Sequence, residues 1–207
     1  MKYLPKSVLD QAYDYQAYRQ LIDDLFAQQK TTGTDHSESM LKYTKLNLAR
    51  MNRLDRKSRL TEATISRLQS INRSLTWLVI TEGWCGDAAQ IVPVLHHMAL
   101  ESDHITLRFI LRDQNLNIMD AFLTNNARSI PKVIVLDSET LEVLGSWGPR
   151  PAEVQQMVMD AKAAGLKTED LALRKQISVN AAEQLHLWYA RDKTKAIQTE
   201  FLAVANG

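Results

Sequence analysis

The stretch that decides the fold is Leu75-Thr76-Trp77-Leu78-Val79-Ile80-Thr81-Glu82-Gly83-Trp84-Cys85-Gly86-Asp87-Ala88, followed by a periodic segment that begins at Ala89. Residues 75–81 are short, apolar and rich in β-branched and aromatic types, which favours a buried strand over a helix. After the turn, apolar residues recur at the spacing of one helix face: Ile91, Val94, Leu95 and Met98. The sequence therefore predicts a strand, a tight turn and a helix, with the only cysteine of the chain at the turn.

That cysteine, Cys85, is predicted to lie just before or within the first turn of the helix. Free backbone N–H groups and the positive end of the helix dipole stabilise an anion at this place. We therefore expect the pKa of Cys85 to fall below the value of a free thiol, about 8.5. The alternative is a small buried apolar residue, as single cysteines often are. The position at a strand-to-helix turn favours the reactive thiolate.

The composition is that of an ordinary globular protein, with 45% hydrophobic residues, 24% charged residues and a net charge of +1 over 207 residues. This length predicts one domain with an appended element. A single cysteine excludes an internal disulfide and multi-cysteine metal sites, and it fits a reducing compartment. The chain has no apolar run typical of a signal peptide or a membrane span, so we expect a cytoplasmic protein without membrane contact.

The rest of the chain alternates helical and strand patterns. Helices are expected near residues 8–29, 39–57, 61–71, 115–123, 152–164 and 169–204, with Thr61 as a cap. Strands are expected at 105–111 and 133–137, followed by a hairpin into 141–147. This order predicts an α/β layer fold. We expect the helices of 8–73 and 169–204 to form a layer that covers one face of the sheet.

Two segments resemble the thioredoxin family. Residues 84–88 and the helix after them are similar to the active-site turn and first long helix of thioredoxins, including a proline, Pro93, within the helix. Ser129-Ile130-Pro131-Lys132, before the strand at 133–137, is similar to the cis-proline loop that faces the catalytic cysteine in that family. From the sequence alone Ile130–Pro131 would be trans by default, so its cis form is implied by the resemblance.

The resemblance implies a thioredoxin-like α/β fold, a central mixed sheet flanked by helices, over residues 75–165. Residues 1–74 and 166–207 are expected to be N- and C-terminal helical extensions, and they suggest a bacterial subgroup with a Trp-Cys-Gly-Asp turn. In this interpretation Cys85 is the catalytic nucleophile, and the other residues of the active-site turn are Trp84, Gly86, Asp87 and Ala88. The substrate groove would be formed by Ile130, Pro131, Gly148 and Arg150. Arg150 either faces an anionic ligand or thiolate, or only starts the next helix.

Three departures from the family pattern matter. Ala88 stands where a dithiol thioredoxin has its second cysteine, so a disulfide cycle within one chain is impossible. Val79 stands where thioredoxins carry a buried acid. Asp87 replaces the usual proline, where it either caps the first helical turn, the role that we favour, or opposes the thiolate by repulsion.

Three functions remain open. The first is a monothiol thiol–disulfide oxidoreductase, in which Cys85 attacks a protein or small-molecule disulfide and glutathione or another small thiol resolves the mixed disulfide. The second is a binding module that holds an extended peptide in the groove without turnover. The third is a redox sensor that uses Cys85 alone. No cofactor is expected, and the sequence does not indicate an oligomeric state.

The segment 42–73 is basic, with nine Lys or Arg against two acids, Asp55 and Glu62. Such a segment can bind nucleic acid or an acidic partner. The basic residues are spread around all helix faces among apolar ones, which favours a solvated helix surface and makes nucleic acid binding unlikely.

The histidines offer no expected chemistry. His96 and His97 lie roughly 16 Å along the helix from Cys85, too far to act as its base. His36, His104 and His186 have no ligand-spaced companions in the sequence, so a metal site is not expected.

Overall fold

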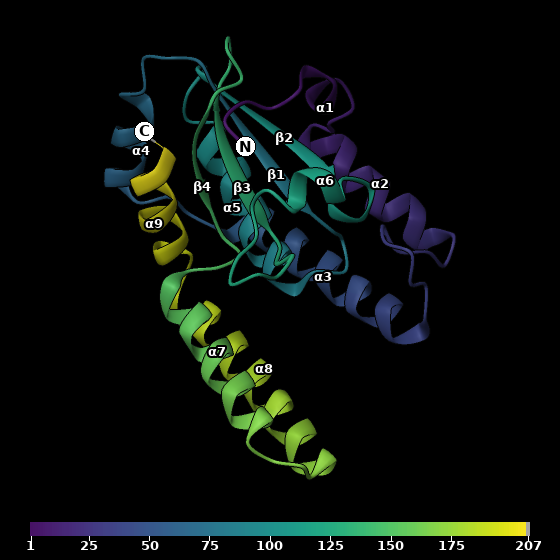
Figure 1. The fold of residues 1–207 in the computed structure, drawn as a ribbon. Coiled ribbons are helices and arrows are strands. Elements are labelled where there is room, and N and C mark those ends of the chain that lie inside the picture. Colours follow the sequence, from purple (N-terminus) through teal and green to yellow (C-terminus); the bar gives the residue numbers. More distant parts are fainter. Residues whose placement is uncertain (206–207) are drawn as a thin grey trace.

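A computed structural model describes residues 1–205 and places a four-stranded mixed sheet at the centre (Figure 1). The strand order is β2-β1-β3-β4. Strand β1 (Leu75–Thr81) pairs in parallel with β2 (Ile105–Leu111) and antiparallel with β3 (Lys132–Asp137), which pairs antiparallel with β4 (Val143–Trp147). Every residue of β1 is buried, as its apolar composition predicts. The expected mixed sheet and α/β fold are confirmed.

Helix α5 (Gly86–Ala99) follows β1 directly and forms the centre of the helical packing. This helix packs against α3 (Glu38–Lys57), α4 (Glu62–Gln69), α9 (Lys195–Ala205) and β2. Pro93 lies inside α5, which continues past it to Ala99. Thr61 caps α4 as predicted, since its side chain accepts a hydrogen bond from the backbone N–H of Thr64. The turn after β1 is thereby fixed between a buried strand and a buried helix.

The N-terminal region forms two helices instead of one, α1 (Lys6–Asp10) and α2 (Tyr15–Ala27). The predicted helix over 8–29 is wrong at its start because Tyr13 exchanges two backbone hydrogen bonds of 2.8 Å with Phe109 of β2. Asp14 then begins α2 as its cap, accepting from the backbone N–H of Ala17. The helical spacing of apolar residues continues across residues 11–14. The backbone N–H and C=O groups of Tyr13 nevertheless bond to a strand far along the chain instead of forming helical hydrogen bonds.

The helix expected at 115–123 is also shorter. A 3₁₀ turn at Arg112–Gln114 leads into α6 (Leu116–Met119). The chain soon turns at Asn125 and Asn126, both of which have positive φ values. Asparagine tolerates this left-handed conformation better than most residues do. The turn brings residues 129–131 back toward the start of β3.

The C-terminal region contains α7 (Ala152–Leu166) and then two helices in place of the single region expected at 169–204. These are α8 (Leu171–Asp192) and α9, and the break lies at Lys193 and Thr194, whose φ values are +53° and +69°. Asp192 accepts from the N–H of Ala196 at 3.1 Å and so helps begin α9. Helices α7 and α8 pack against each other and extend away from the sheet (Figure 1). The expectation that the whole C-terminal region covers the sheet is therefore wrong for α8.

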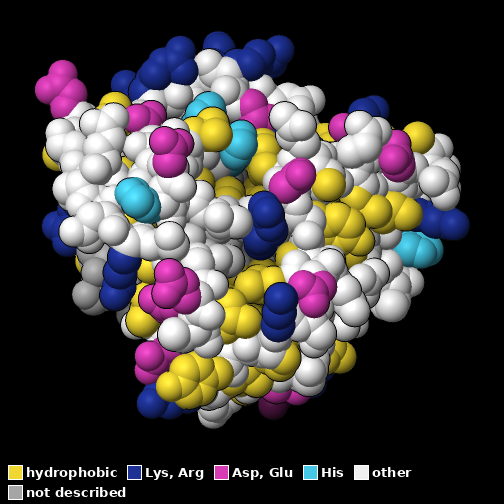
Figure 2. Space-filling view, turned by 90° about the horizontal axis from the view of Figure 1, so that it is seen from above, with side chains coloured by type: hydrophobic (Ala, Val, Ile, Leu, Met, Phe, Trp, Pro, Cys, Tyr) yellow, Lys and Arg dark blue, Asp and Glu magenta, His cyan; other side chains and the backbone are white. Residues whose placement is uncertain are grey.

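The molecular surface carries charges of both signs. On the face shown in Figure 2, acidic and basic side chains are interspersed over most of the surface, with apolar side chains between them. Within residues 1–205, none of the helices combines the length and the hydropathy that crossing a membrane requires.

Candidate active site

Cys85 is the N-cap residue of α5, as the sequence predicts. Its sulfur accepts a hydrogen bond from the backbone N–H of Ala88 at 3.5 Å. The thiol donates to the carbonyl oxygen of Ile130 at 3.3 Å. The side chain is 8% exposed. A sulfur that both accepts from the helix and donates to the loop is held as a protonated thiol in one position.

Two loops near the site each contain a cis peptide bond, Ile130–Pro131 before β3 and Gly148–Pro149 after β4. The first is the cis bond that the resemblance implied. Gly148 has a φ of +113°, and a Cβ on it would lie 2.4 Å from the carbonyl oxygen of Pro131. Lys132, which is buried, donates to the carbonyl oxygen of Gly148 at 3.0 Å. Glycine is thus required at 148 by both conformation and space. Gly148 lies against Pro131, and the preceding residue, Ile130, accepts from the Cys85 thiol.

Asp87 does not cap the helix, because the Cys85 side chain holds that position. Its carboxylate accepts from Arg150 through Nε at 2.9 Å and Nη2 at 2.6 Å, both on Oδ2. Oδ1 accepts from the hydroxyl of Tyr189 at 3.0 Å. The favoured role as a first-turn cap is therefore wrong. Arg150 lies near the thiol, as one interpretation predicted, but the Asp87 carboxylate is its direct partner.

The predicted low pKa of Cys85 is wrong, because the structure raises this pKa instead. Burial and the negative charge of Asp87 raise the pKa of Cys85 to about 12. Backbone N–H groups of Ala88 and Asp87 and the charge of Arg150 oppose this shift, but they are the smaller effects. The helix start does stabilise a thiolate, as predicted. Desolvation outweighs it, because the thiol is buried between the start of α5 and the 130–131 loop.

A buried acid lies next to the turn, but not at the position of Val79. Glu82 is fully buried and accepts from the hydroxyl of Thr32 and from the backbone N–H of Asp113, the latter at 3.0 Å. The Thr32 hydroxyl oxygen also accepts from the N–H of Gly83 at 3.0 Å. Burial raises the pKa of Glu82. This acid therefore connects two separate segments, at Thr32 and at Asp113, to the turn that precedes Cys85.

The remaining turn residues have packing roles. Trp84 is half-buried beneath Arg112, whose guanidinium carbon lies 4.7 Å from the centre of the indole ring. A Cβ at Gly86 would meet only an ordinary contact, 3.5 Å from Nη1 of Arg50. Ala88 is 2% exposed. Trp84 and Ala88 are therefore packed against the rest of the structure, whereas Gly86 is not crowded.

Helices α3 and α8 support the turn through residues that the sequence analysis did not single out. Asn47 donates from Nδ2 to the carbonyl oxygen of Gly83 at 3.1 Å, and Arg50 donates to Asn47 at 3.1 Å. Nη2 of Arg50 also lies 2.9 Å from Nε2 of His186. An acid directly after a predicted buried strand, such as Glu82, is a feature of the sequence that could have indicated a supporting role. The hydrogen bonds of Asn47 and Arg50 join residues 36 and 136 positions apart, and no local sequence pattern predicts them.

The other histidines are placed elsewhere. The ring of His96 stacks on Tyr15 with centroids 4.0 Å apart. Nε2 of His97 lies 3.2 Å from the carbonyl oxygen of Asp55. Neither histidine is placed against the Cys85 sulfur, so its hydrogen-bond partners are the backbone groups described above.

Comparison with known proteins places this arrangement in context. The thioredoxin family model matches residues 33–163. A protein of unknown function from Pseudomonas aeruginosa has a crystal structure with a TM-score of 0.59 and 22% identity, covering 96% of this chain and 95% of that one. An HIV epitope scaffold has a TM-score of 0.52 and 20% identity at the same coverage. These identities support a common fold and nothing more. No curated protein matches the chain at a significant level.

Proposed function

Because this chain belongs to the thioredoxin family, we propose that it is a monothiol thiol–disulfide oxidoreductase with Cys85 as its nucleophile. The observation that carries the proposal is the position of the sulfur. It lies at the N-cap of α5, where it accepts from the N–H of Ala88 and faces the cis Ile130–Pro131 loop. A thiolate formed there would keep the Ala88 N–H as a donor and gain from the nearby charge of Arg150.

The chemistry proceeds in two exchanges. The Cys85 thiol first loses its proton to solvent, and the thiolate attacks the glutathione sulfur of a glutathione-capped protein thiol. A new S–S bond forms to Cys85, the old one breaks, and the departing sulfur leaves as a thiolate that takes up a proton. A glutathione thiolate then attacks the mixed disulfide, which releases Cys85 and forms glutathione disulfide. The external thiol is needed because Ala88 cannot resolve the intermediate.

The raised pKa of Cys85 sets a condition on this cycle. With the thiol buried and protonated, the resting protein reacts slowly at neutral pH. Exchange requires that the contact between the thiol and the carbonyl oxygen of Ile130 opens, so that substrate and solvent reach the sulfur. The reaction rate is therefore expected to rise steeply with pH.

The burial of Cys85 also favours a second function, a binding module with no turnover. In that case the sulfur is a packing and hydrogen-bonding atom, and the loop at residues 130–131 and 148 holds an extended peptide. A redox sensor would share the first reaction step with the enzyme but would lack turnover.

The test is a reaction with glutathione disulfide. Reduced protein is incubated with it at pH 7 to 10, and intact mass spectrometry follows the addition of one glutathione. Turnover is then measured on a glutathione-capped protein with excess glutathione. The oxidoreductase is expected to form the adduct faster as pH rises and to turn over.

Cys85→Ser is the control, since the hydroxyl keeps the size of the side chain and loses the nucleophile. Adduct formation without turnover would support the sensor. The absence of any adduct at every pH, with Cys85→Ser indistinguishable from the wild type, would contradict thiol chemistry and favour the binding module.

A further inference from the structure

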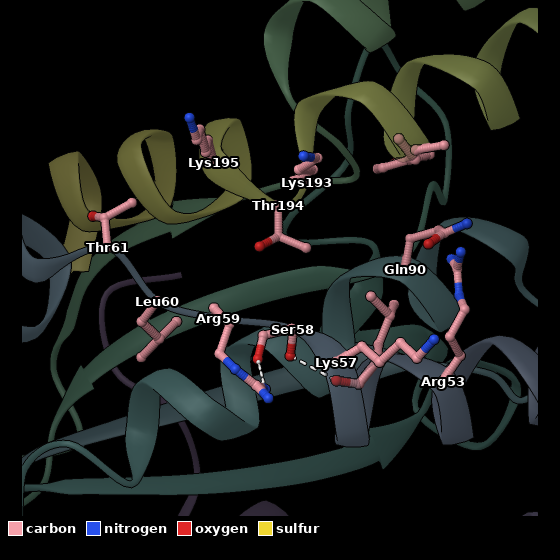
Figure 3. Close-up of a pocket in the computed structure, with 13 residues that line it drawn as sticks. Arg53, Lys57, Ser58, Arg59, Leu60, Thr61, Gln90, Lys193, Thr194 and Lys195 are labelled. Atoms are coloured by element: carbon pink, nitrogen blue, oxygen red, sulfur yellow. Dashed lines mark hydrogen bonds between the residues drawn. The ribbon is translucent and has the colours of Figure 1, made fainter.

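A basic cavity of about 420 Å³ lies beside the candidate active site, between α3, the segment 58–61 and the junction of α8 with α9. Figure 3 shows the residues that line it. Of these thirteen described residues, none is acidic and five are cationic: Arg53, Lys57, Arg59, Lys193 and Lys195. Gln90 of α5 and Tyr189 also line the cavity, and the Tyr189 hydroxyl donates to Asp87 of the candidate active site at 3.0 Å.

Within residues 1–205, three of the five cavity cations have no ion-pair partner. Among the described residues, no ion pair involves Arg53, Lys57 or Lys193. The charge of Arg53 adds to burial in lowering the pKa of neighbouring Arg50, as expected beside an uncompensated cation. An acid outside the cavity, Asp192, interacts with Lys195.

The side chains have different orientations in Figure 3. Arg53 and Lys57 extend from α3 on the side of Gln90, and Thr194 points inward from the opposite wall. Lys195 points away from Thr194. Arg59 is fixed by two hydrogen bonds from Nη1 to backbone carbonyl oxygens, of Arg56 at 3.2 Å and Ser58 at 2.8 Å. Arg53 and Lys57 are thus the cations with unpaired charges on the α3 wall.

The walls are joined by one buried side chain. Gln198 is fully buried, and its Oε1 accepts from the backbone N–H of Thr61 at 2.9 Å. Its Nε2 donates to the carbonyl oxygen of Arg59 at 3.0 Å and to the hydroxyl oxygen of Thr194 at 2.9 Å. Three lining residues from two distant segments are therefore held in place before any ligand arrives. Such preorganisation reduces the ordering cost of binding.

We propose that this cavity binds a small organic anion that carries more than one phosphate group. The guanidinium of Arg53 suits bidentate contact with phosphate oxygens, and Lys57 and Lys193 add compact charges. Leu54, Leu60 and Ala190 offer apolar wall for the organic part. The volume is that of a small-molecule site. Three of the nine cations in the basic segment 42–73 line this one cavity, which gives part of that segment a specific role.

The experiment is calorimetric titration with inorganic tripolyphosphate and with ATP at low ionic strength. We expect one site per chain, with ATP binding at least as tightly as tripolyphosphate. The double variant Arg53→Gln/Lys57→Gln should weaken both ligands by at least about tenfold, since it removes two charge-assisted contacts. Cys85→Ser should bind like the wild type, which separates this proposal from the thiol chemistry.

The matched control is Lys45→Gln/Lys175→Gln, which removes the same charge from two exposed lysines outside the cavity. Its affinity should stay within about twofold of the wild type. Absence of binding by the wild type would overturn the proposal, as would equal weakening by both double variants. A single-stranded oligonucleotide that binds more tightly than ATP, and loses affinity with both double variants, would replace it with an extended nucleic-acid surface.

Discussion

The negative charge of Asp87 opposes ionisation of Cys85. Replacing Asp87→Asn removes the carboxylate but keeps a side-chain oxygen that can accept from the Tyr189 hydroxyl, which now donates to Asp87 at 3.0 Å. It also leaves Arg150, whose guanidinium is paired with Asp87 at 2.6 Å, without its anionic partner. Both changes favour a thiolate at Cys85. The pKa of Cys85 should therefore fall below its wild-type value of about 12.

The size of the effect follows from Coulomb's law. A unit charge roughly 6 Å from the sulfur, at an effective dielectric constant of about 20, changes the ionisation free energy by about 2.8 kcal/mol. This corresponds to roughly two pKa units, because one unit is about 1.4 kcal/mol. Desolvation, the largest cause of the raised pKa, is unchanged by the substitution. A fall of one to two units, to a value still above that of a free thiol, is the expected result.

The assay is the rate of alkylation by iodoacetamide between pH 6 and 10. For the wild type, the rate should rise tenfold per pH unit over the whole range, since the thiol titrates above it. For Asp87→Asn, the rate at pH 8 should be several-fold higher, because the larger thiolate fraction is partly offset by lower nucleophilicity. Circular dichroism checks that the variant folds. Arg150 keeps one side-chain partner in this variant, because its Nη1 donates to Oε1 of Gln155 at 3.2 Å.

Asp103→Asn is the matched control, because Asp103 is exposed and lies outside the site. Its alkylation profile should equal that of the wild type. A wild-type profile that levels off near pH 8.5 would refute the dominance of burial. An unchanged or slower Asp87→Asn would refute the role given to the carboxylate.

Two further predictions concern stability. The folded protein holds the Cys85 proton more tightly than the unfolded chain does, so this contribution is fully present below the ordinary thiol pKa and is lost as pH rises toward about 12. Urea unfolding at pH 8 to 10 measures this for the wild type and for Cys85→Ala. Above pH 9, the free energy of unfolding of the wild type should fall by about 1.4 kcal/mol per pH unit more than that of the variant. Parallel declines would contradict the assigned burial. Gly148→Ala should lower the free energy of unfolding by about 2–4 kcal/mol, because its Cβ would lie 2.4 Å from the carbonyl oxygen of Pro131 at a φ of +113°. The control Gly86→Ala makes only an ordinary 3.5 Å contact with Arg50 and should change the free energy of unfolding by less than about 1 kcal/mol. Equal thermal unfolding of the two variants would refute the steric argument.

Local patterns were sufficient for most of the fold. The apolar run at 75–81, the helix after it and the cap at Thr61 were all predicted, since they depend on periodicity and on side chains a few residues apart. The helix boundaries failed where distant backbone groups intervened. Residues 11–14 look helical by periodicity, but Tyr13 pairs with Phe109 on β2. Local periodicity cannot predict this pairing, because the two residues are far apart in the sequence.

The site shows the same division. Sequence patterns alone placed one cysteine at a helix start without a second cysteine, and the resemblance added the cis-proline loop opposite it. The ionisation of that cysteine depends instead on how distant segments pack around it. The fold buries the thiol against the 130–131 loop, and Asp87 accepts from Arg150 and Tyr189 instead of capping the helix. The helix dipole acts within one turn of chain and can be seen in a sequence, whereas desolvation depends on every segment that excludes water from the sulfur.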